Sequence, residues 1–177
     1  MIRPVLHAAC AVVFALPVAG ASMAKEAIPP AYVSIADEHG VPANLLYAIA
    51  KTESNAGFSG KPWPWTLNVR GAPLYFQTRK HAVDYLEQEI AAGEDRIAIG
   101  LMQIYWRYHG DAIGSPDLAI DPVFNVTYGA SFLRSLFERH GDWAVATACY
   151  HHCDRKKPGL GDDYAQLVAN RLGRIQP

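Results

Sequence analysis

Apolar side chains recur at intervals of three and four residues along much of the chain, a pattern that predicts helices. The first predicted helix, residues 32–39, ends at Gly40. The second takes Pro42 as its first residue and carries on one face Leu45, Leu46, Ile49, Ala50 and Glu53. Later runs predict helices over residues 78–92, 122–140, 142–150 and 162–172.

The segment between the second and third predicted helices has a different texture, rich in proline, glycine and aromatic residues. It contains Pro62-Trp63-Pro64-Trp65-Thr66-Leu67-Asn68-Val69 and then Leu74-Tyr75-Phe76. Such a pattern predicts a loop with one or two short strands that form a hairpin. The fold class is therefore mainly α, as a helical domain with a small β-hairpin or loop insert after the second helix.

The first 24 residues have the order of a secretory signal peptide. Arg3 precedes an apolar run over residues 8–18, and small-residue cleavage patterns follow at residues 19–21 and 22–24. A membrane anchor is the alternative, but a span needs about 20 apolar residues and this run is shorter. We therefore expect a cleaved signal over residues 1–24, a linker over residues 25–30 and one domain over residues 31–177.

Composition and charge narrow the classes of protein. The 177 residues are 50% hydrophobic and 19% charged, which is typical of a globular chain and unlike a disordered one. The net charge is −1. A nucleic-acid-binding protein usually carries a basic excess, so we expect no nucleic-acid partner.

Two cysteines, Cys149 and Cys153, remain once the signal is removed. In an exported protein an even number of cysteines favours a disulfide, although a spacing of four requires the helix to end or distort there. His140, His151 and His152 lie nearby in the sequence and make a zinc site conceivable. Because no second ligand pair is visible, a disulfide or free thiols are favoured over a metal.

Glu53 is an acidic residue on a face that is otherwise apolar. Removing a carboxyl group from water raises its pKa, which allows it to act as a general acid near neutral pH. The alternative is a glutamate at a helix end that reaches out to water. Gln103 is a second polar residue in an apolar run, Gly100-Leu101-Met102-Gln103-Ile104, where its amide can orient a sugar or bond local backbone.

Four motifs occur together in order along the chain: Glu53-Ser54, the 100–104 run, Asn125-x-x-x-Gly129-x-x-x-Leu133, and residues 144–150. In this order they resemble the motifs of the family 1 (Slt-type) lytic transglycosylases, which have a lysozyme-like α+β fold. The resemblance spans roughly residues 32–152. The aromatic insert of residues 62–69 is also similar to a stretch in members that accompany conjugation and secretion machinery.

The resemblance implies a role for each matching position. Glu53 would be the catalytic acid, with Ser54 supporting its placement. Met102, Gln103 and Tyr150 would line the glycan cleft. No cofactor or metal is implied for this chemistry.

The same resemblance gives Asn125 and Gly129 a structural role, in which they pack their helix against the catalytic one. The sequence departs from the family after Tyr150, where Asn-Ala-Gly usually follows and His151-His152-Cys153 stands instead. Aromatic residues are dense around the insert and after Gln103, and flat rings suit sugar faces. We expect Tyr105 and one of Trp63 and Trp65 to face the cleft.

The chemistry of the family needs one carboxyl group rather than the two of ordinary glycosidases. The acid protonates the glycosidic oxygen and then takes the proton of the sugar's own 6-hydroxyl, which leaves a 1,6-anhydro ring. The candidates for a second carboxylate all lie in or beside turns, where acids are usually solvated or cap helices: Glu94, Asp95, Asp117 and Asp121. The single-acid reaction therefore fits better.

The resemblance implies an enzyme that cleaves the β-1,4 bond between N-acetylmuramic acid and N-acetylglucosamine in peptidoglycan. With the signal-like residues 1–24 it predicts a periplasmic enzyme, which we expect to be a monomer. Its partners would be glycan strands and components of an envelope-spanning conjugation or secretion complex. Two alternatives stay open at this point. One is a hydrolytic, goose-type lysozyme, which needs a second acid across the cleft, and the other is a glycan-binding assembly component without catalysis.

Overall fold

The computed structural model describes residues 25–57, 59–153 and 158–176. Its described elements, in chain order, are α1 (Pro30–His39), α2 (Ala43–Glu53), β1 (Thr66–Val69), β2 (Ala72–Tyr75), α3 (Arg79–Ala91), β3 (Ile97–Ile99), β4 (Ile104–Tyr105), α4 (Trp106–Ile113), α5 (Pro116–Ile120), α6 (Pro122–His140), α7 (Trp143–His151) and α8 (Pro158–Leu172). The mainly α fold with a small β element is confirmed. The predicted signal peptide lies outside the described residues.

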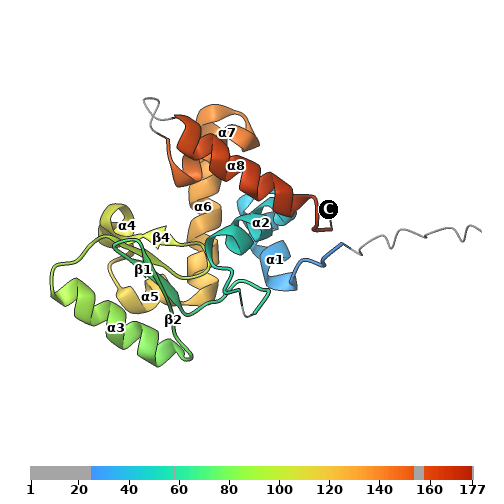
Figure 1. Ribbon diagram of the computed structural model, residues 1–177. Coiled ribbons are helices and arrows are strands. Elements are labelled where there is room, and N and C mark those ends of the chain that lie inside the picture. Colours follow the sequence, from blue (N-terminus) through green and yellow to red (C-terminus); the bar gives the residue numbers. More distant parts are fainter. Residues whose placement is uncertain (1–24, 58, 154–157, 177) are drawn as a thin grey trace, which may run out of the picture.

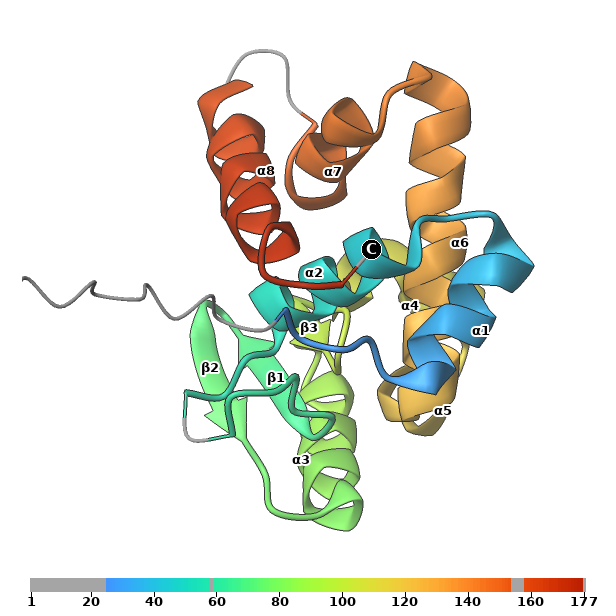
Figure 2. The same cartoon turned by 90° about the vertical axis from the view of Figure 1, so that its right-hand side faces the viewer.

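Helix α2 crosses the middle of the molecule (Figures 1 and 2). The small sheet and α3 lie on one side of it, and α7 with α8 lie on the other. Residues 45–50 of α2 are all buried, so this helix is apolar on more than the single face that the periodicity predicts. The reason is that α8 covers its second side. A helix that is apolar all round belongs in a core, and this position carries Glu53 into the centre of the molecule.

The sheet has four antiparallel strands in the order β2-β1-β3-β4. The predicted hairpin is β1 and β2, paired in register from Thr66 with Tyr75 to Val69 with Ala72. Strands β3 and β4 and helices α4 and α5 were not predicted, because each is at most eight residues long and none repeats an apolar period. They connect the sheet to α6.

Helix boundaries follow the capping residues. Gly40, with φ of 63°, ends α1, and Thr78 caps α3. Asp121 and Asp142 accept hydrogen bonds from the first turns of α6 and α7. Pro42 is the N-cap of α2 rather than its first helical residue.

The segment predicted as a linker, residues 25–30, is attached to the domain. Glu26 pairs through its backbone with the strand-like end of the chain at Ile175. Its carboxylate accepts hydrogen bonds from Tyr47, at 2.8 Å, and from Lys51, both on α2. Within the described residues, no helix combines the length and hydropathy that a bilayer span requires.

Candidate active site

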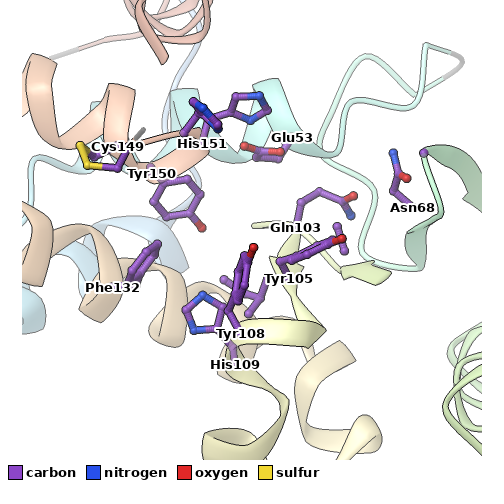
Figure 3. Close-up of a pocket in the computed structure, with 15 residues that line it drawn as sticks. Glu53, Asn68, Gln103, Tyr105, Tyr108, His109, Phe132, Cys149, Tyr150 and His151 are labelled. Atoms are coloured by element: carbon purple, nitrogen blue, oxygen red, sulfur yellow. A yellow bond between two sulfur atoms is a disulfide. The ribbon is translucent and has the colours of Figure 1, made fainter. Parts of the chain in front are cut away.

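A cavity of about 740 Å³ opens beside the C-terminal end of α2 (Figure 3). The residues that line it come from the end of α2, the sheet, α4, α6 and the end of α7. Its described lining is Glu53, Asn68, Gly71, Ala98, Gln103, Ile104, Tyr105, Tyr108, His109, Phe132, Cys149, Tyr150, His151, His152 and Cys153. Of the predicted site residues, the cavity brings together Glu53, Gln103, Tyr105 and Tyr150.

Glu53 is the last residue of α2, and its carboxyl group lies at the cavity wall. Burial raises the pKa of Glu53 from its usual value of 4.5 to about 7, and a hydrogen bond from Tyr164 opposes the rise. The C-terminal end of a helix carries partial negative charge, which also disfavours a carboxylate at that position. Glu53 can therefore hold a proton near neutral pH, as a general acid must.

Tyr164 was not predicted as a site residue. This α8 residue is buried, and its hydroxyl donates to Glu53 Oε1 at 2.6 Å. Burial, together with the nearby Glu53 carboxyl, raises the pKa of Tyr164 well above its usual value, so the phenol remains a donor. The spacing of Tyr164, Val168 and Leu172 marks one face of a helix, but a sequence spacing does not show which distant residue that face meets.

The turn at residues 100–103 forms the wall opposite α7. Gly100 has φ of 74°, and a Cβ there would lie 2.8 Å from the side chain of Asn125, so only glycine fits. Gln103 also has a positive φ, 46°, and its Nε2 donates to the Gly100 carbonyl at 2.9 Å. A non-glycine residue in this conformation is strained, which is a recurrent property of functional sites.

The side chain of Asn125 fixes this turn through hydrogen bonds to backbone groups. It accepts from the Met102 backbone N–H at 2.8 Å and donates to the carbonyls of Ile99 at 2.9 Å and Ala119 at 2.8 Å. Met102 is fully buried, and its side chain packs against Gly129, where a Cβ would lie 2.8 Å from Met102 Cγ. Asn125 and Gly129 thus have a structural role at this wall, where they contact residues 99–102.

Tyr150 connects the two walls. It lies on α7, and its hydroxyl donates to the Met102 carbonyl at 2.9 Å across the cavity floor. Burial and the nearby Glu53 carboxyl raise the pKa of Tyr150 well above its usual value. Figure 3 shows its ring above Phe132, with Glu53 and Gln103 to the right of it.

Several predicted site residues lie elsewhere, and one of them is Met102, which is fully buried and does not line the cavity. Ser54 is buried and its hydroxyl donates to the Ala50 carbonyl at 2.9 Å, so it closes the end of α2 and does not line the cavity. Trp63 donates through its indole to the Phe76 carbonyl at 2.8 Å, and Trp65 packs against the core. Neither tryptophan is among the described residues that line the cavity.

The aromatic residues that do line the cavity come from β4 and α4. Tyr105 and Tyr108 have ring centroids 5.4 Å apart, and Tyr108 is 76% exposed. His109 lies deeper, with Nδ1 at 3.0 Å from the hydroxyl of Tyr128. The cavity also takes in Tyr108, His109 and Asn68, which the sequence does not predict as site residues because the hydrophobic pattern shows neither α4 nor the orientation of β1.

Among the described residues that line the cavity, Glu53 is the sole carboxyl group. The candidates for a second one are engaged elsewhere. Glu94 pairs with Arg96 and Arg70, and Asp95 pairs with Arg107. Asp117 pairs with Arg79, and Asp121 caps α6. Among the described residues, the cavity thus contains the Glu53 carboxyl group and no second carboxyl group opposite it.

Cys149 and Cys153 form a disulfide, with their Cα atoms 4.1 Å apart. As the sequence analysis required, the helix ends at this point, since α7 stops at His151. His140 Nε2 lies 3.6 Å from Cys149 Sγ and 3.9 Å from Cys153 Sγ. Because the two sulfur atoms are bonded to each other, they are not available as metal ligands.

Comparison with known families agrees with this site. A profile of the transglycosylase SLT domain matches residues 32–158, which is well over half of the chain and includes Glu53, the 100–104 run and Tyr150. No curated protein and no solved structure matches the chain significantly. From the family match we conclude that the chain belongs to the transglycosylase SLT-domain family and is a lytic transglycosylase that acts on peptidoglycan.

Proposed function

We propose that Glu53 is both the acid and the base of this reaction. The protonated carboxyl donates its proton to the oxygen of the β-1,4 bond as the bond to C1 of N-acetylmuramic acid breaks. The 6-hydroxyl of the same sugar then bonds to C1, and the Glu53 carboxylate takes its proton. One proton is given and one is recovered, so no water is consumed and a 1,6-anhydro end results.

The observation that carries this proposal is the single carboxyl among the described lining residues, with a pKa of about 7. At neutral pH such a group exists in both forms, so it can donate a proton and afterwards accept one. A hydrolytic lysozyme of the two-carboxylate kind would need a base aimed at water from across the cavity. The ion pairs of Glu94, Asp95 and Asp117 argue against that alternative.

The proposal is tested by mass spectrometry of the fragments released from purified peptidoglycan. We expect 1,6-anhydro-N-acetylmuramic acid ends from the wild type and at least about a thousandfold less release from Glu53→Gln. Glu138→Gln is the matched control, because Glu138 is exposed on α6 and pairs only with Arg134 among the ion pairs of the described residues. Reducing ends in place of anhydro ends would instead establish a hydrolase, and unchanged release from Glu53→Gln would exclude Glu53 as the acid.

We also propose that the enzyme acts in the periplasm after removal of residues 1–24, and that it opens the wall locally for a conjugation or secretion apparatus. The support is the signal-like pattern of those residues and the similarity of the 62–69 insert to that of members which accompany such machinery. In a host strain lacking the protein, transfer or secretion should be restored by the wild type and not by Glu53→Gln. Restoration by both would mean that the chain serves the apparatus without cutting the wall.

A further inference from the structure

A stacked pair of rings joins the end of α7 to the catalytic carboxyl. The imidazole of His151 lies flat on the phenol of Tyr164, with ring centroids 4.6 Å apart and planes inclined by 8°. The Tyr164 hydroxyl in turn donates to Glu53 Oε1 at 2.6 Å. His151 therefore contacts the residue that orients Glu53.

Two features hold this pair in place. The Cys149–Cys153 disulfide brackets His151 and so limits the conformations open to the end of α7. On the partner helix, a Cβ at Gly161 would lie only 2.6 Å from the His152 carbonyl oxygen. Gly161 thus lets α8 approach the end of α7 closely, one turn before Tyr164.

The contact between His151 and Tyr164 is a stack of two aromatic rings. Burial and the neighbouring His152 lower the pKa of His151, which favours the neutral imidazole. A neutral ring stacked in parallel gains dispersion energy and shields one face of the phenol from water. The stack restricts rotation of the Tyr164 ring without using its hydroxyl, which stays available to Glu53.

We propose that His151 is a positioning residue for the reaction. It holds the Tyr164 hydroxyl against Glu53, and the disulfide holds His151. The inference rests on the proposed function, because an oriented carboxyl matters only if Glu53 transfers the proton. The sequence His151-His152-Cys153 departs from the pattern of the family. The proposal gives this segment a function, because His151 positions Tyr164 and Cys153 forms the disulfide.

The role of the hydroxyl follows from the charge that Glu53 acquires. After Glu53 gives up its proton, the carboxylate is buried, and the Tyr164 hydrogen bond stabilises it. A loosely held phenol would donate for a smaller fraction of the time. The pKa of Glu53 would then rise, and the carboxyl would lose the fixed orientation that proton transfer requires.

The test compares His151→Asn, which removes the stack, with His151→Phe, which keeps an aromatic ring. We expect kcat on peptidoglycan to fall about tenfold in His151→Asn and to stay within about twofold of wild type in His151→Phe. Because His151 also lines the cavity, both variants can change KM, and the positioning role predicts that only His151→Asn lowers kcat. His81→Asn, at an exposed position on α3, is the matched control.

A second readout needs no activity. The Glu53 carboxyl carbon can be followed by NMR as a function of pH, and we expect its pKa to rise by about one pH unit in His151→Asn and to stay unchanged in His151→Phe. Thermal unfolding verifies that both variants fold. An unchanged Glu53 titration in His151→Asn, or losses of equal size in the two variants, would overturn the inference. If the wild type released no anhydro ends, the proposed function would fail, while this titration would still decide whether His151 acts on Glu53.

Discussion

On one side of the cavity the turn at residues 100–103 is held by a buried asparagine, whereas on the other side the end of α7 is held by a disulfide and a ring stack. Asn125 uses its carbonyl and its amino group in hydrogen bonds to three backbone groups. His151 touches Tyr164 through ring faces alone, at the edge of an open cavity. The first wall is held because its buried backbone groups need hydrogen-bond partners, which Asn125 supplies. The second wall is held because the end of α7 carries a disulfide and its His151 ring stacks on Tyr164.

Because of this difference, we expect the first wall to contribute mainly to the stability of the fold and the second mainly to catalysis. Breaking the first wall leaves buried polar groups unpaired, which costs folding free energy. A substitution that removes the His151 stack leaves few buried polar groups unpaired, but it allows the Tyr164 hydroxyl to move away from Glu53. We therefore expect mutations in the two walls to affect different quantities.

The largest effect is expected from Asn125→Ala. The substitution leaves the Met102 N–H and the carbonyls of Ile99 and Ala119 without their partner. We expect the free energy of unfolding, measured by urea denaturation, to fall by about 3 kcal/mol. Asn170→Ala, at an exposed position on α8, should change it by less than about 0.5 kcal/mol. Equal effects at the two positions would show that the Asn125 hydrogen bonds do not stabilise the fold.

Tyr164→Phe should act on the chemistry instead. Loss of a hydrogen bond to a charged group is expected to lower kcat by about tenfold or more. Wild-type kcat/KM should fall as pH rises through about 7, because Glu53 loses its catalytic proton there. In Tyr164→Phe this fall should move to higher pH, since the lost donor stabilised the carboxylate. Tyr85→Phe is the control, because Tyr85 hydrogen-bonds Glu89 away from the cavity. A fall that moved to lower pH would contradict the account.

The smallest effect is expected when the disulfide is removed by Cys149→Ser with Cys153→Ser. The ring stack and the packing at Gly161 remain, so kcat should fall by only about threefold, with KM unchanged. Wild-type protein treated with a dithiol reductant should show the same loss, and the double variant should not respond to the reductant. A large change in KM would mean that the disulfide shapes the glycan-binding surface instead.

The two walls also differ in how well the sequence predicts them. Glu53 and Gln103 are polar residues in apolar runs, and this local contrast is visible without a fold. Tyr164 lies 111 positions from Glu53 along the chain, and their contact depends on how α8 packs on α2. Periodicity shows that a helix has a buried face but does not show what that face meets.

The two tryptophans show the reverse case, in which the sequence favours residues that are absent from the described lining of the cavity. Trp63 and Trp65 look like sugar-binding residues because they are aromatic and clustered, but Trp63 bonds the Phe76 carbonyl and Trp65 packs against the core. Aromatic residues serve cores and binding surfaces equally well, so their density does not separate the two uses. Tyr108, by contrast, is 76% exposed at the cavity, which only the fold of α4 makes visible.

The central claim is that one carboxyl group completes the reaction without water. It is tested most directly by digesting peptidoglycan in water enriched in oxygen-18 and analysing the released fragments by mass spectrometry. We expect anhydro ends with no heavy oxygen, because the 6-hydroxyl of the sugar itself bonds to C1. Reducing ends that carry one heavy oxygen would show that water attacks, and the single-acid mechanism would then be wrong.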